Sequence, residues 1–184
     1  MAGSFFYNLL EPHNFADVAS VTLLSTDLPL VANTGLLPPL ANFFARAGKT
    51  LRIEMFGRIT TAATPGNLTW DIYWGTNAAA NGTLICSSAA QALTASQTNL
   101  SWSLQLDIEC RSVGNGSAGT LFGTGFALFN EGVVTPHMMI PASAPAVSAG
   151  IDLTAANTVS VQAKRSGSTV ETMQVHKVKY FEVN

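Results

Sequence analysis

The sequence predicts an all-β protein, an antiparallel β-sandwich of jelly-roll type with about nine strands. Three observations predict it: apolar side chains that recur at every second residue, turns rich in glycine and proline, and few helix signals. A length of 184 residues suits one folded domain. We therefore expect a single sandwich over residues 21–184, preceded by an extended arm over residues 1–20.

The clearest strand covers residues 100–111, where six apolar residues alternate with polar ones. The same period of two covers residues 68–74 and, before the turn at residues 63–67, residues 51–55. Because a Thr/Pro/Gly turn separates these last two segments, we predict that they pair as a hairpin.

The remaining strands are expected to be shorter or less regular. They are predicted at residues 21–25, 28–31, 83–87, 120–129, 158–165 and 169–183, the last with a bulge at 176–178 where the alternation slips. Two short helices are expected at residues 40–47 and 89–95. Gly123 and Gly125 fall on one strand face and are expected to make room for a large neighbour such as Trp102.

The chain carries little charge. Nine Lys and Arg and eleven Asp and Glu make up 11% of the residues, against about 25% in average soluble domains, and the net charge is -2. This balance argues against a nucleic-acid partner, which would require a basic surface. No apolar run is long enough to span a bilayer, so no membrane partner is expected either. Residues 72–106, 112–130 and 132–151 carry no charge at all, and we expect contacts between subunits there.

No catalytic or metal-binding motif stands out. Residues 114–119 match G-x-G-x-x-G, but they lie between two strands, which is typical of a hairpin loop and not of a dinucleotide site. The histidines, His13, His137 and His176, are too dispersed in the sequence for a spaced ligand pair. Glu54 and Glu109 are candidates for a glycosidase carboxylate pair that the sequence alone does not bring together.

The cysteines and tryptophans are interpreted as core residues. Cys86 and Cys110 lack paired metal or redox spacing and are expected to be buried thiols, with a single disulfide as the alternative. Trp70, Trp74 and Trp102 could stack against sugars, but they share a face with Leu, Ile and Cys, which favours the core. No cofactor, metal or enzymatic activity is therefore expected.

Two longer stretches and one strand carry a resemblance to a known class of protein. They are TLRIEMFGRITTAATPGNLTWDIYWG at 50–75, SWSLQLDIECRSVGNGSAGT at 101–120, and the strand LFGTGFALF that follows. The order of these elements resembles β-sandwich structural proteins of tailed bacteriophages, of the head-decoration or minor capsid type. The resemblance implies a jelly-roll trimer seated on a capsid and no enzymatic function.

The expected function is that of a virion structural protein that decorates and cements the phage head. We expect it to be made in the host cytoplasm, to self-associate as a trimer and to bind the major capsid protein at the capsid surface. The alternative is a carbohydrate- or receptor-binding module of a phage tail or fibre. The expected contact residues lie in the arm and in a charge-free proline loop: Phe5, Phe6, Tyr7, Pro136, His137, Met138, Met139, Ile140 and Pro141.

Overall fold

The computed structural model describes residues 7–10, 17–31, 37–38, 40–130 and 137–183, and these form an all-β structure. Twelve strands are found in this part of the chain. In order they are β1 (Tyr7–Leu10), β2 (Val21–Thr22), β3 (Leu28–Pro29), β4 (Thr50–Thr60), β5 (Asn67–Gly75), β6 (Thr83–Ser87), β7 (Gln91–Ala92), β8 (Leu100–Ser112), β9 (Thr120–Phe129), β10 (His137–Ile140), β11 (Thr158–Arg165) and β12 (Thr172–Val183).

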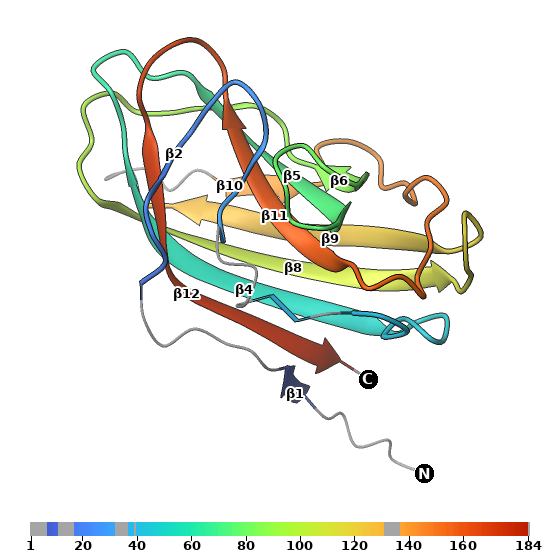
Figure 1. Cartoon of the computed structure of the whole chain (residues 1–184). Coiled ribbons are helices and arrows are strands. Elements are labelled where there is room, and N and C mark those ends of the chain that lie inside the picture. Colours follow the sequence, from blue (N-terminus) through green and yellow to red (C-terminus); the bar gives the residue numbers. More distant parts are fainter. Residues whose placement is uncertain (1–6, 11–16, 32–36, 39, 131–136, 184) are drawn as a thin grey trace.

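The strands form two antiparallel sheets that pack face to face, as Figure 1 shows. Sheet A has the order β1-β12-β4-β8-β9-β10, with β2 also paired to β12. Sheet B has the order β3-β11-β5-β6, with β7 also paired to β5. The first strands thus pair with the last strands, and β4 and β5 lie inside their sheets. The predicted β-sandwich is confirmed.

Nine of the strands lie where the sequence predicts strands, and the register of β12 shifts between Val175 and Lys177, as the slipped alternation indicates. The three others are short. β1 lies within the expected arm, β10 within the expected proline loop, and β7 within an expected helix.

The predicted hairpin between residues 51–55 and 68–74 is wrong. β4 pairs with β12 and β8 in sheet A, whereas β5 pairs with β11, β6 and β7 in sheet B, so the turn between them crosses from one sheet to the other. Both strands have one strongly apolar face. Placing them in opposite sheets turns these faces toward each other, which buries both.

Both predicted helices are also wrong. Residues 41–44 form turns, and Asn42 adopts a φ of 57°, outside the right-handed helical region. In the second segment Gln91 and Ala92 pair with β5, while Leu93 enters the core. Burial and strand pairing outweigh the weak helix propensity of these short segments.

Aromatic residues occupy the centre of the sandwich. Trp70 of sheet B lies between Trp102 and Phe129 of sheet A, at ring-centroid distances of 5.2 Å and 6.2 Å. Gly57 makes room for Trp102, because a Cβ there would lie 2.6 Å from the indole ring. The expectation that Gly123 serves this purpose is wrong: Gly123 faces Cys86, whose sulfur lies 2.4 Å from the position of a Cβ.

Candidate functional site

β10 contains most of the contact residues predicted in the proline loop. Met139 is 66% exposed and His137 is also exposed, but Met138 and Ile140 are buried in the core. Both were expected at a contact surface. In the structure they face the core instead, because a strand turns every second side chain inward. Pro141, just after the strand, is half-buried.

The predicted contact residues Phe5, Phe6 and Pro136 lie outside the described residues. Tyr7 lies in β1, where it is paired with Val183 at the edge of sheet A.

The outer face of sheet A, which we call the sheet A face, carries exposed apolar side chains. Met139 lies opposite Phe126, which is 36% exposed, and Phe56, on β4, is 45% exposed. One row of residues crosses the sheet from β4 to β10, next to the pair of Phe126 and Met139. It consists of Phe56, Ser103, Leu128 and His137. A shallow hollow of about 230 Å³ adjoins Phe126 and Met139.

Two pairs of opposite charges lie on the sheet A face. Arg52 donates from Nε and Nη2 to both carboxylate oxygens of Asp107, at 2.7 Å each. Arg111 lies 3.3 Å from Glu109 and stacks over Phe122. These charges lie on the polar face that the alternation of β8 predicts. Both pairs are in contact with solvent, so each contributes little to stability.

The residues considered for catalysis or sugar binding are not assembled into a site. Trp70, Trp74 and Trp102 are each at most 2% exposed, so the predicted core assignment holds and their faces are closed to sugars. Glu109 lies opposite Thr50, four residues along β4 from Glu54, which separates the two carboxyl-bearing residues by about 13 Å along the strand. That exceeds the separation in glycosidases.

The histidines also remain apart. Nδ1 of His176 lies 2.6 Å from a carboxylate oxygen of Asp17, His137 is on β10, and His13 lies outside the described residues. In the part of the chain that the structure describes, no three His, Cys, Asp or Glu side chains are grouped so that they could hold a metal ion.

Both cysteines are buried free thiols. Cys86 lies at the bottom of an open groove of about 350 Å³ between β6 and residues 141–149. Burial, with a smaller effect from the charge of Asp71, raises the pKa of Cys86 to about 12. Burial and the charge of Glu109 likewise raise the pKa of Cys110. Neither thiol is therefore activated as a nucleophile.

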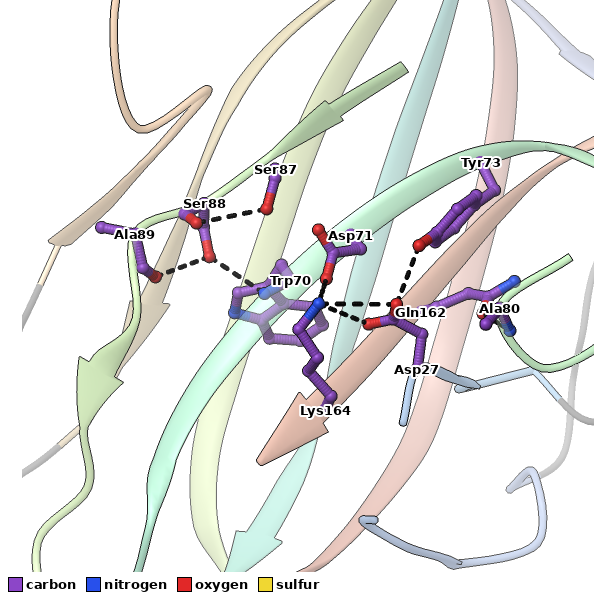
Figure 2. A network of polar contacts seen from close by, with 10 residues as sticks. All are labelled: Asp27, Trp70, Asp71, Tyr73, Ala80, Ser87, Ser88, Ala89, Gln162 and Lys164. Atoms are coloured by element: carbon purple, nitrogen blue, oxygen red, sulfur yellow. Dashed lines mark hydrogen bonds and ion pairs between the residues drawn. The ribbon is translucent and has the colours of Figure 1, made fainter. Parts of the chain in front are cut away.

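A buried polar cluster, shown in Figure 2, lies on the outer face of sheet B. Asp71 and Tyr73 project from β5, Lys164 from neighbouring β11, and Asp27 from the segment between β2 and β3. Asp27 and Asp71 are only 6% and 2% exposed, whereas the Lys164 side chain is 36% exposed.

Distances within this cluster are short. Nζ of Lys164 lies 2.7 Å from Oδ2 of Asp71 and 3.3 Å from Oδ1 of Asp27. The hydroxyl of Tyr73 donates to Oδ2 of Asp27 at 2.8 Å. Two carboxyl groups thus converge on one ammonium group.

The two carboxyl groups titrate in opposite directions. Burial and a hydrogen bond to Asp71 raise the pKa of Asp27, and the opposing hydrogen bond from Tyr73 is weaker. Burial alone would raise the pKa of Asp71 too, but hydrogen bonds from Asp27, Lys164 and Ser87 lower it below its ordinary value. Of the two groups, Asp27 therefore keeps its proton to the higher pH.

The sequence did not reveal this cluster. Its alternation places Asp71 and Tyr73 on a polar face, which is correct, but that face is covered. Gln162, on β11, is fully buried on this face. Its side chain forms hydrogen bonds with the backbone of Ala78 and Ala80, in the segment that follows β5. The one signal for the cluster in the sequence is the acidic residue Asp71, which lies between two core residues, Trp70 and Ile72.

A second buried ion pair lies where the turn between β11 and β12 meets the end of sheet B. Nε of Arg165 lies 3.1 Å from Oε2 of Glu171, and the two side chains are 8% and 0% exposed. Oε1 of Glu171 accepts from Thr169 Oγ1 at 2.7 Å and from the Gly66 amide at 3.3 Å. Arg165 also donates to the carbonyl oxygens of Leu23 and Gly167.

No protein-family model matches the chain, and no curated protein matches it in sequence. No helix in the described residues has the length and apolar character required to cross a membrane.

Proposed function

We propose that this chain is a structural protein of a phage particle, a capsid decoration protein that self-associates through the sheet A face. The single observation that carries the self-association is the exposed apolar group on that face, formed by Phe56, Phe126 and Met139. The phage setting rests on the resemblance of residues 50–75 and 101–129 to head-decoration and minor capsid proteins.

The physical properties of the face support a protein contact. Met139 alone is 66% exposed, and it lies beside Phe126 in the pairing of β9 with β10. Covering such side chains removes apolar surface from water, which stabilises association by about 25 cal/mol for each Å² covered. Two charge pairs of this face, Arg52–Asp107 and Arg111–Glu109, already neutralise each other within the chain, so these four charges do not have to be desolvated unpaired in a contact.

The sandwich suits a building block because it presents a broad, rigid sheet. A decoration protein binds many equivalent lattice positions, and a self-associated form engages several at once, which raises its avidity. In an oligomer with closed symmetry, each copy places the same face at its contacts.

The test combines oligomeric state with capsid binding. Light scattering after size-exclusion chromatography should give a mass above 19.3 kDa for the wild type and a lower mass for Met139→Glu. Val170→Glu is the matched control, since Val170 is 63% exposed in the turn before β12. Its oligomeric state should be that of the wild type.

Capsid binding is measured with capsids of the encoding phage that lack this chain. The wild-type protein should sediment together with these capsids, and Met139→Glu should not. A wild-type protein that is monomeric at micromolar concentration, or that binds no part of the particle, contradicts the proposal.

A further inference from the structure

We propose that Asp27 and Asp71 share one proton. When this proton is released as the pH rises, the chain around Asp27 detaches from the outer face of sheet B. This device is independent of the proposed function. It stands on the geometry of the cluster in Figure 2 and on the course of the segment that carries Asp27.

That segment, residues 17–31, is called the strap here, and it runs across the sandwich from one sheet to the other. Near its start the amide of Val18 donates to the carbonyl of Val175 in sheet A at 2.9 Å. Near its end the amide of Leu30 donates to the carbonyl of Val161 in sheet B at 3.1 Å. Asp27 lies just before β3 and is the strap residue that reaches the polar cluster.

Charge balance requires a proton in this cluster. With both carboxyl groups ionised, two negative charges would face one ammonium group, and two carboxyl groups that are at least 94% buried would hold a net charge of -1. Burying an uncompensated charge is costly, and neighbouring carboxylates repel each other, so one of them keeps its proton. With Asp27 protonated, Asp71 and Lys164 neutralise each other.

Two buried carboxylate oxygens without a hydrogen-bond donor agree with a shared proton. Oδ1 of Asp27 and Oδ2 of Asp71 are both buried and neither has a hydrogen-bond donor in acceptable geometry, although both contact the Lys164 ammonium. A proton between the two carboxyl groups supplies the missing donor. The directions of the pKa shifts agree, since the pKa of Asp27 is raised and that of Asp71 is lowered.

Side chains from β5, β6 and β11 surround the pair. From β5, Tyr73 donates to Asp27; from β11, Lys164 contacts both carboxyl groups. On β6, the Ser87 hydroxyl donates to the Ser88 carbonyl and lowers the pKa of Asp71, and the charge of Asp71 in turn raises the pKa of Cys86. Lys164 is the one positively charged group among them, so no second cation compensates when the shared proton leaves.

Release of the proton would loosen the strap locally. The carbonyl of Asp27 accepts from the Ala80 amide at 3.2 Å, so displacement of Asp27 disturbs residues 76–82 as well. Leu23 and Leu30, at most 1% exposed, keep the strap in the core on either side of Asp27. The expected change is therefore an opening around residues 25–29, and not loss of the fold.

The first test measures the protonation directly in the wild-type protein. The side-chain carboxyl carbon of each aspartate is followed by NMR as the pH is raised. The midpoint of Asp27 should lie above the ordinary value of 3.8 and that of Asp71 below it. An Asp27 midpoint at or below the ordinary value overturns the proposal, and this result requires no variant.

The second test measures the opening by amide hydrogen exchange. As the pH rises from the ordinary value of 3.8 to the Asp27 midpoint, protection at Leu28 and Ala80, relative to Leu104 in β8, should fall by up to about tenfold for each pH unit and then level off. Asp27→Asn cannot lose the proton and should abolish this fall, whereas the matched control Asp107→Asn, in a half-buried ion pair of the other sheet, should retain it. Equal pH dependence in the wild type and Asp27→Asn overturns the proposal.

Discussion

Breaking the buried Arg165–Glu171 pair should be among the most damaging single changes in the described part of the molecule. In Glu171→Ala the Arg165 guanidinium, in a side chain 8% exposed, loses its counter-charge. The Thr169 hydroxyl and the Gly66 amide lose their acceptor at the same time. Removal of one partner of a buried ion pair costs about 3–5 kcal/mol.

The expected loss is large enough for a direct measurement. For a domain of this size each kcal/mol lowers Tm by about 2–4 °C, so Glu171→Ala should lower Tm by roughly 6–20 °C. Urea denaturation followed by tryptophan fluorescence should give the corresponding fall in the free energy of unfolding, because Trp70 and Trp102 are buried in the core.

Asp107→Ala is the control, because it removes the acceptor of an ion pair whose side chains are 22% and 34% exposed. It should cost about 0–1 kcal/mol. The double variant Arg165→Met/Glu171→Leu removes both charges and should recover much of the loss. If Glu171→Ala costs no more than Asp107→Ala, the reasoning from burial is refuted.

Three further predictions concern the core and the polar cluster. Gly57→Ala would place a Cβ 2.0 Å from the Gln174 carbonyl oxygen and 2.6 Å from Trp102, so it should cost about 3 kcal/mol or more in urea denaturation; a wild-type midpoint would contradict this. In native protein at neutral pH, Cys86 should react with iodoacetamide far more slowly than after unfolding, because burial raises its pKa to about 12; equal rates would disprove this. The lowered pKa of Asp71 contributes stability above its ordinary value of 3.8 that is lost as the pH falls through the folded-state pKa. Asp71→Asn should therefore flatten the acid side of the stability profile measured by thermal unfolding, and an unchanged profile would count against it.

The sequence predicted the strands well where apolar alternation is long. β8 was placed to within one residue and β12 to within three, and the bulge after Val175 was predicted from a single slip in the pattern. Alternation identifies which side of a strand is buried, but it does not identify the neighbouring strand. The partner of β4 was therefore wrong, although its apolar face was right.

The candidate site was less predictable because it depends on contacts distant in the chain. Asp27 and Asp71 are brought together only because β11 pairs with both β3 and β5. The alternation of β10 was missed because the strand is only four residues long and lies in a proline-rich stretch. Its pattern is too short to distinguish a strand from a loop.

The pairing of the first strands with the last has a consequence for biosynthesis. β1, β2 and β4 bind to β12, and β3 binds to β11, so the sheets cannot close until residues 158–183 have left the ribosome. Until then β4 and β5 present unpaired edges and apolar faces to water. Folding dominated by such distant contacts is slow, and the waiting chain is prone to aggregation. We therefore expect the yield of soluble protein to depend on translation rate, temperature and chaperone supply more than on the stability of the finished fold.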